Sequence, residues 1–169
     1  LYVYCINNPV NYWDYSGEDA LFIIDENAVM GNGHASVVIQ DENGTWYYCY
    51  WGNSNAVYIA VPDRYLELFK NESLEKEPLE NLNQFLKSDD RGNAKYNGTY
   101  TSYVYIQGDF SEGIKWLKGE IDKANKKSTS SNKNYSLLSK NCSQTSISAL
   151  RKGILPNGKS FSQYLTPYT

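Results

Sequence analysis

Short apolar runs separated by turn residues dominate the first two-thirds of the chain, a pattern typical of β-strands. These runs predict strands at residues 20–24, 34–39, 45–51, 56–61 and 99–106. Apolar positions at helical spacing predict helices at 63–88 in two pieces, from 109 to about 124, and from about 135 to 152 with a break near Asn141. We therefore expect one α+β domain, an antiparallel β-sheet packed against helices.

Composition and charge narrow the class of protein to which the chain can belong. The chain has 169 residues, 41% of them hydrophobic and 21% charged, which fits one globular domain with its own core. Residues 1–111 carry 6 Lys and Arg against 16 Asp and Glu, whereas residues 112–169 carry 10 against 3. We interpret this asymmetry as two oppositely charged parts that attract each other within one fold. No dense basic cluster with interleaved aromatics is present, so we expect no nucleic-acid partner.

Counts of special residues exclude several kinds of site. Three widely spaced cysteines argue against a disulfide scaffold and a four-ligand zinc site, and one histidine excludes a histidine-rich metal centre. We expect neither a metal nor an organic cofactor. No apolar run is long enough for a transmembrane segment. Because the first residue is Leu1, we interpret the chain as a piece of a longer polypeptide.

Two residues stand where nucleophilic chemistry needs them. Cys142 lies at the end of a polar stretch, directly before apolar residues at helical spacing, so it is expected in the first turn of a helix. The helix dipole favours the thiolate form of a cysteine at that position. The backbone N–H of that turn also faces a developing oxyanion. His34 begins a predicted strand directly after Gly31-Asn-Gly33, and a nearby imidazole can exchange a proton with the thiol. Cys49 lies mid-strand among aromatics, so packing explains it.

A third group is needed to orient the imidazole of His34. The dipeptide Asn43-Gly44 predicts a two-residue hairpin turn, in which the numbers of paired residues sum to 87. His34 then lies opposite Asn53, with both side chains on one face. We therefore predict Asn53 as the residue that holds the ring tautomer. Asn55 and Ser36 are the alternatives if the strand ends at Gly52.

The first 17 residues resemble the end of an Rhs-repeat core. Tyr2-Val-Tyr4, Asn8-Pro9 and Asp14-Tyr-Ser-Gly17 follow the order Tyr-x-Tyr, Asn-Pro and Asp-Pro-x-Gly of the last repeat unit, with tyrosine in place of the usual proline. The resemblance implies that residues 1–17 are a remnant of the core and that residues 18–169 are a toxin domain. It also implies a parent Rhs shell, secretion or delivery into target cells, and a cognate immunity protein as partner.

The body of the chain resembles circularly permuted papain-like hydrolases, the NlpC-like and lecithin–retinol acyltransferase groups. Gly33-His-Ala-Ser36 at the start of a hairpin and Lys140-Asn-Cys142 at the start of a helix carry the resemblance. It implies a permuted papain-like fold in which Cys142 is the nucleophile and His34 the base. The family includes peptidases and amidases, acyltransferases and lipid esterases.

The leading hypothesis is a polymorphic toxin of bacterial competition that acts as a cysteine hydrolase through an acyl-enzyme intermediate. A peptide or amide substrate suits the NlpC-like resemblance, and a lipid ester suits the acyltransferase resemblance. A non-catalytic binding module is an alternative, in which substitution of the Cys–His pair leaves function intact. A nuclease toxin is another, although one histidine without an acidic cluster provides little for metal-dependent phosphodiester cleavage.

Overall fold

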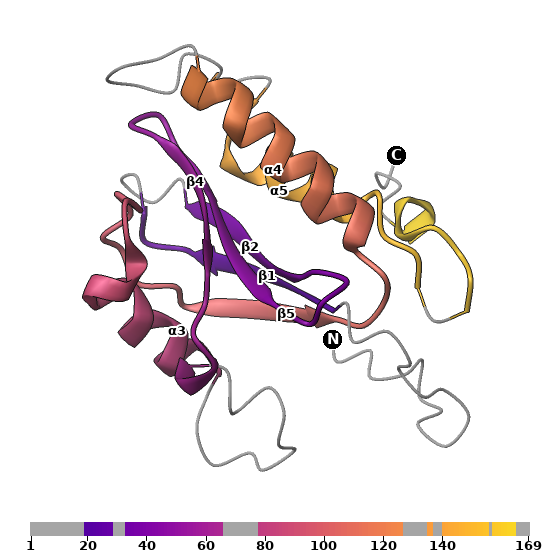
Figure 1. Cartoon of the computed structure of the whole chain (residues 1–169), viewed down its shortest axis with the longest axis horizontal. Coiled ribbons are helices and arrows are strands. Elements are labelled where there is room, and N and C mark those ends of the chain that lie inside the picture. The colour runs from indigo at the N-terminus through magenta and orange to yellow at the C-terminus, as the bar shows by residue number, and fades with distance from the viewer. Residues whose placement is uncertain are drawn as a thin grey trace.

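A five-stranded antiparallel sheet with helices on both faces confirms the predicted α+β class (Figure 1). The computed structural model describes residues 19–28, 33–65, 78–126, 135–136, 140–155 and 157–164. The predicted Rhs-like segment therefore lies outside the described residues. The strands are β1 (Ala20–Asp25), β2 (His34–Gln40), β3 (Trp46–Trp51), β4 (Ala56–Ala60) and β5 (Ser102–Ile106), in the spatial order β4-β3-β2-β1-β5.

Each face of the sheet is buried against its own helical layer (Figure 1). Helix α3 (Pro78–Lys87) covers one face, where its apolar side chains pack with Tyr48, Tyr96 and Tyr100. Helices α4 (Ser111–Lys126) and α5 (Cys142–Leu150) cover the other face. Short 3-10 turns lie at Asp63–Tyr65, Asp89–Arg91 and Phe161–Tyr164. Because side chains alternate across a strand, odd and even positions of β2 and β3 belong to different cores.

The helix predicted from 109 to about 124 is confirmed as α4, and the apolar residues at helical spacing that predict it are all buried against the sheet: Ile114, Leu117, Ile121 and Ala124. Asp109 and Glu112 have the spacing of a capping pair, which predicts that both side chains bond the first turn, but the start of the helix differs. Asp109 accepts a hydrogen bond from the backbone N–H of Ser111 at 2.9 Å, whereas Glu112 forms an ion pair with Lys115 at 3.4 Å. The helix thus begins at Ser111 with one carboxylate at its first N–H groups.

Of the other two helical regions, only the last is shown to be shorter than predicted. In the region 63–88, α3 matches the second predicted piece, and most of the first piece lies outside the described residues. The last helix begins at Cys142 and not near residue 135, because Asn141 caps it. The Asn141 side chain accepts from the N–H of Gln144, and the Gln144 side chain accepts from the N–H of Asn141, which forms a capping box.

The β2–β3 turn has three residues, so the predicted register is wrong by one. The N–H of Asp41 donates to the carbonyl of Thr45 at 2.9 Å, which closes the ladder around residues 42–44. Gly44 takes a left-handed conformation with φ of 77°, as in hairpins with a bulge after a type I turn. The numbers of paired residues, such as Val37 and Cys49, therefore sum to 86 and not to the predicted 87.

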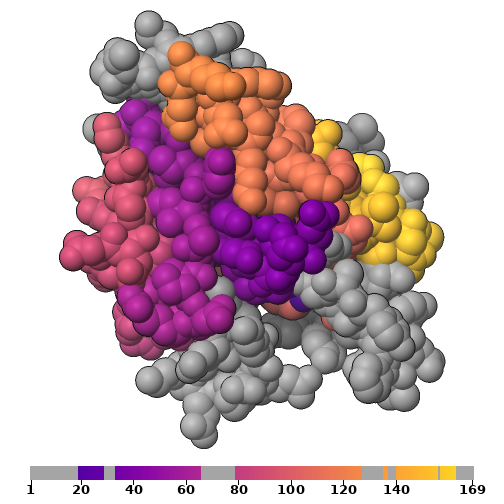
Figure 2. Space-filling model, viewed as in Figure 1, coloured from indigo at the N-terminus to yellow at the C-terminus, as the bar shows by residue number. Residues whose placement is uncertain are grey.

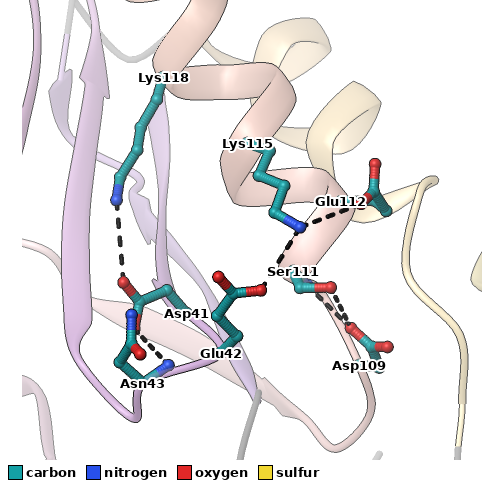
Figure 3. A network of polar contacts seen from close by, with 8 residues as sticks. All are labelled: Asp41, Glu42, Asn43, Asp109, Ser111, Glu112, Lys115 and Lys118. Atoms are coloured by element: carbon teal, nitrogen blue, oxygen red, sulfur yellow. Dashed lines mark hydrogen bonds and ion pairs between the residues drawn. The ribbon is translucent and has the colours of Figure 1, made fainter.

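Ion pairs join the acidic and basic parts of the chain, as the charge asymmetry predicted (Figure 3). The Nζ atom of Lys115 in α4 lies 3.5 Å from Oε2 of Glu42 in the β2–β3 turn. The Nζ atom of Lys118 lies 4.0 Å from Oδ2 of Asp41. The Lys118 ammonium also sits over the ring of Tyr47, 3.4 Å from its centroid. Figure 2 shows α4, β4 and the α3 region as neighbouring parts of one surface.

Candidate active site

The start of β2, the end of β1 and the start of α5 meet at one end of the sheet. His34 is the first residue of β2 and pairs directly with Asp25, the last residue of β1. The indole N–H of Trp51, at the end of β3, donates to the carbonyl oxygen of Lys140 at 3.0 Å. This bond attaches the start of α5, and with it Cys142, to the same end of the sheet. Both predicted catalytic residues therefore lie at this end.

The imidazole of His34 is buried among tyrosine rings. It stacks on Tyr96, with 4.4 Å between ring centroids and 25° between ring planes. The ring of Tyr50 lies 5.2 Å away. Burial lowers the pKa of His34 from 6.5 to about 4, and the negative charge of Asp25 opposes this shift in part. At pH 7 the ring is therefore neutral and can accept a proton.

A row of hydroxyl groups runs from His34 into the core. The Nε2 atom of His34 lies 3.1 Å from Ser36 Oγ. The hydroxyl of Tyr100 donates to the same Oγ at 2.8 Å and lies 2.8 Å from the hydroxyl of Tyr48. Burial raises the pKa of both tyrosines, so their hydroxyls stay protonated at neutral pH. We call Ser36, Tyr100 and Tyr48 the hydroxyl chain.

Asp25 supplies a buried carboxylate that the sequence did not identify. Its Oδ2 accepts from the hydroxyl of Tyr96 and from the N–H of Thr99 at 3.2 Å, and its Oδ1 accepts from the N–H of Asn27 at 2.9 Å. Tyr96 therefore bonds Asp25 at one end while its ring stacks on His34. The sequence offered one signal for this residue, because Asp25 ends the apolar run 20–24 just before a turn.

Cys142 occupies the first position of α5, where the helix dipole favours negative charge. The thiol is buried. Burial raises the pKa values of Tyr50 and Tyr135, and the neighbouring sulfur of Cys142 contributes to both increases. Tyr50 thus interacts electrostatically with Cys142, while its ring packs against the ring of His34. Cys49 is buried mid-strand as predicted, and burial raises its pKa to about 12.

The structure brings His34 and Cys142 to one end of the sheet without joining them. Within the described part of the chain, no hydrogen bond connects the sulfur to the imidazole. The imidazole packs with Tyr96 and Tyr100 on the face that α3 covers, whereas α5 packs on the opposite face. Tyr50 packs against the imidazole and interacts electrostatically with Cys142.

The pairing predicted for Asn53 is wrong. The three-residue turn shifts the β2–β3 register by one, which brings Gly52 and not Asn53 opposite His34 when the ladder is extended. Asn53 lies in an exposed bend after β3. Of the alternatives named from the sequence, Ser36 contacts the ring, whereas Asn55 donates to the carbonyl oxygen of Asn93 at 2.7 Å.

A polar groove of about 650 Å³ lies along the segment that contains Tyr96. One wall is the start of β4, and the opposite wall is the segment 91–97 that also positions Tyr96 against His34. The polar side chains along it are Asn55, Arg91, Asn93, Lys95, Asn97 and Asn125. Amide groups both donate and accept hydrogen bonds, so the groove suits a ligand with peptide-like polar groups.

Compared with protein-family models, curated proteins and solved structures, the chain matches none significantly. Among the described residues, no group of three or more His, Cys, Asp or Glu side chains is arranged to hold a metal ion. In the same residues, no helix is both long and apolar enough to cross a membrane.

Proposed function

We propose that this protein is a papain-like thiol hydrolase of the peptidase or amidase type. Cys142 is the nucleophile and His34 is the base. The observation that carries the proposal is the position of a helix-start thiol and a neutral imidazole at one end of the sheet. The amide-rich groove along the segment 91–97, which holds Tyr96 but is not lined by Cys142 or His34, supports a substrate with amide groups.

The reaction balances with the residues of the site and water. The sulfur of Cys142 bonds to the carbonyl carbon of an amide while the thiol proton passes to His34. Backbone N–H groups at the start of α5 stabilise the charge on the carbonyl oxygen. His34 returns the proton to the amine as the C–N bond breaks. Water then hydrolyses the thioester and regenerates the thiol.

The proposal requires the Cys142 sulfur and the His34 ring to approach each other past Tyr50 when substrate binds. Catalytic hydrogen bonds are often long or poorly aligned in free enzymes and tighten in the substrate complex. A neutral ring in the free protein suits this sequence of events, because it receives the thiol proton only when the thiol attacks.

We further propose that the hydrolase is the toxin domain of a larger Rhs protein, delivered into competing cells and blocked in the producer by an immunity protein. This part rests on the resemblance of residues 1–17 to the last unit of an Rhs core. A toxin that cleaves amides needs such a partner, since the producer contains the same classes of substrate.

Growth of a bacterium that expresses the full chain tests the proposal. The chain is produced in the cytoplasm or with an export signal, as wild type, Cys142→Ala, His34→Ala and the control Cys49→Ala. Circular dichroism verifies that each protein folds. We expect wild type and Cys49→Ala to stop growth and the two site variants to be harmless.

The compartment in which the wild type kills separates cytosolic amides from cell-wall peptides as the target. Killing by a folded Cys142→Ala or His34→Ala protein would contradict thiol catalysis. A harmless wild type in both compartments would contradict the toxin proposal. Hydrolysis of a peptide library by the purified wild type, with Cys142→Ala as the inactive reference, tests the chemistry separately.

A further inference from the structure

Strand β4 forms one edge of the sheet and, among the described residues, pairs with β3 alone. Backbone hydrogen bonds to the β3 side at Asn55 (3.0 Å) and Val61 (2.9 Å) place the odd-numbered residues of β4 toward β3, because bonded pairs alternate along an antiparallel ladder. The N–H and C=O groups of the even-numbered residues therefore point outward. Of these residues Ala56 is buried, Tyr58 is partly exposed and Ala60 is exposed. No described backbone group bonds the outer side of Tyr58 or Ala60.

The polar groove continues this edge at the start of β4. Its walls come from both helical layers, since the segment 91–97 packs with α3 on one face and Asn125 belongs to α4 on the other. The groove therefore crosses the edge of the sheet between the two layers. The side-chain amide of Asn55 donates to the carbonyl oxygen of Asn93 at 2.7 Å, which ties the strand to the segment. Extended peptides bind such edges as an added strand, through main-chain hydrogen bonds.

The groove lies at the same end of the sheet as the candidate active site. Ala56, the first residue of β4, pairs with Trp51, whose indole bonds the carbonyl oxygen of Lys140 just before Cys142. His34 begins β2, which is two strands away from β4. Two strand spacings amount to roughly 10 Å. A peptide bound along β4 therefore lies beside the reacting centre and not in it.

The charge of the groove is positive. Arg91 and Lys95 line it, and no carboxylate does. Within the described part of the chain, neither cation forms an ion pair. The guanidinium of Arg91 is held by its bonds to the carbonyl oxygens of Leu86 at 3.1 Å and Tyr96 at 3.4 Å, whereas Lys95 is exposed. An acidic side chain on a bound peptide therefore meets two cations without displacing a described ion pair.

We propose that the outer edge of β4 is a docking site for an extended, acidic segment of the polypeptide substrate. The segment joins the sheet as a further strand through backbone hydrogen bonds to Tyr58 and Ala60, and its carboxylates lie near Arg91 and Lys95 in the groove. The inference rests on the proposed function only in naming the bound peptide as substrate. The edge, the groove and its charge are independent of the catalytic pair.

Binding of model peptides to the full chain tests the charge of the site, with Cys142→Ala present to prevent cleavage. The probes are labelled eight-residue peptides that alternate threonine, a strand-forming residue, with glutamate, glutamine or lysine. In fluorescence anisotropy we expect the glutamate peptide to bind most tightly and the lysine peptide about tenfold more weakly. Lys95→Gln should weaken the glutamate peptide about two- to five-fold. Lys87→Gln is the matched control, because Lys87 is an exposed lysine of α3 outside the groove, and we expect no change.

Amide hydrogen exchange, followed by NMR, separates strand addition from attraction between charges alone. We expect the glutamate peptide to slow exchange at Tyr58 and Ala60, whose N–H groups face the open edge. Exchange at Val57 and Ile59 should change much less, because their N–H groups already bond β3. Slow exchange at Tyr58 and Ala60 without peptide would mean that a second copy or another segment of the chain occupies the edge, and would overturn the proposal.

Three other results would also overturn the proposal: no binding of the glutamate peptide at millimolar concentration, equal binding of the glutamate and lysine peptides, or binding that leaves exchange at Tyr58 and Ala60 unchanged. For an acidic peptide that the wild type hydrolyses, Lys95→Gln should raise KM and leave kcat unchanged, since docking is lost and the chemistry is not. Docking without hydrolysis of any peptide would contradict the hydrolase and leave the edge as a peptide-binding site. Hydrolysis with a KM that Lys95→Gln does not change would contradict the docking site alone.

Discussion

His34 couples the stability of the fold to pH. The pKa of its ring is about 4 in the folded protein and 6.5 in an unperturbed chain. Between these values the unfolded chain binds a proton that the folded protein does not bind. The free energy of unfolding attributable to His34 therefore rises as pH increases from about 4 to 6.5 and is constant above that window. The full difference corresponds to about 3 kcal/mol.

Substitution of His34 by glutamine removes this contribution. We expect the free energy of unfolding of the wild type to decrease more steeply than that of His34→Gln as pH falls from 7 to 4. Urea titrations at four or five pH values measure both slopes, and carboxyl groups contribute to both proteins alike. Parallel pH profiles would show that the folded ring is protonated as readily as the unfolded one.

Local sequence was enough to nominate Cys142 and His34 as candidate residues, but it did not predict the side chains that surround His34. A thiol before a helix and an imidazole after a glycine turn are local signals, readable within a few residues. The bond from Tyr96 to Asp25 joins residues 71 positions apart, and the bond from Tyr100 to Ser36 spans 64 positions. No local pattern pairs such residues, because their proximity is set by how β1, β2 and the segment before β5 assemble.

At the scale of elements, a single turn residue accounts for the error in the predicted partner of His34. An Asn-Gly pair fits both a two-residue turn and the last two positions of a three-residue turn, and the local sequence favours the first. Asp41 selects the second, because its carboxylate accepts the N–H groups of Asn43 and Thr45, each at 3.0 Å. The strands themselves were predictable from their apolar pattern, whereas their register was not.

The three-residue turn makes Gly44 costly to replace. Its φ of 77° lies in the left-handed region, where a side chain costs about 1–2 kcal/mol. We expect Gly44→Ala to lower the free energy of unfolding by about that amount, measured by urea titration. Gly119→Ala is the matched control, because it lies inside α4 with open space around it, and there alanine should stabilise by about 0.5–1 kcal/mol. Equal effects of the two substitutions would contradict the left-handed turn.

At the scale of the whole molecule, two interactions hold α4 against the sheet. Its apolar stripe is buried in the core, and its lysines reach the acidic β2–β3 turn (Figure 3). The charge asymmetry along the chain is visible in the sequence and suggests that the ion pairs between the lysines and the β2–β3 turn are important. Yet the Lys115 and Glu42 side chains are 56% and 61% exposed, and such exposed pairs contribute only about 0.2–1 kcal/mol.

We therefore expect the buried apolar stripe to stabilise α4 more than the ion pairs do. Substitutions at two neighbouring residues of α4 compare the two contributions to the free energy of unfolding. Ile114 is buried and Lys115, the next residue, is exposed, so the two substitutions change the same turn. We expect Ile114→Ala to cost about 2–5 kcal/mol in urea unfolding. A double-mutant cycle of Lys115→Ala and Glu42→Ala should give a coupling below about 1 kcal/mol that weakens with added salt. A coupling as large as the loss at Ile114 would mean that attraction between the charged parts, and not the buried stripe, holds the helix that supports α5 and its thiol.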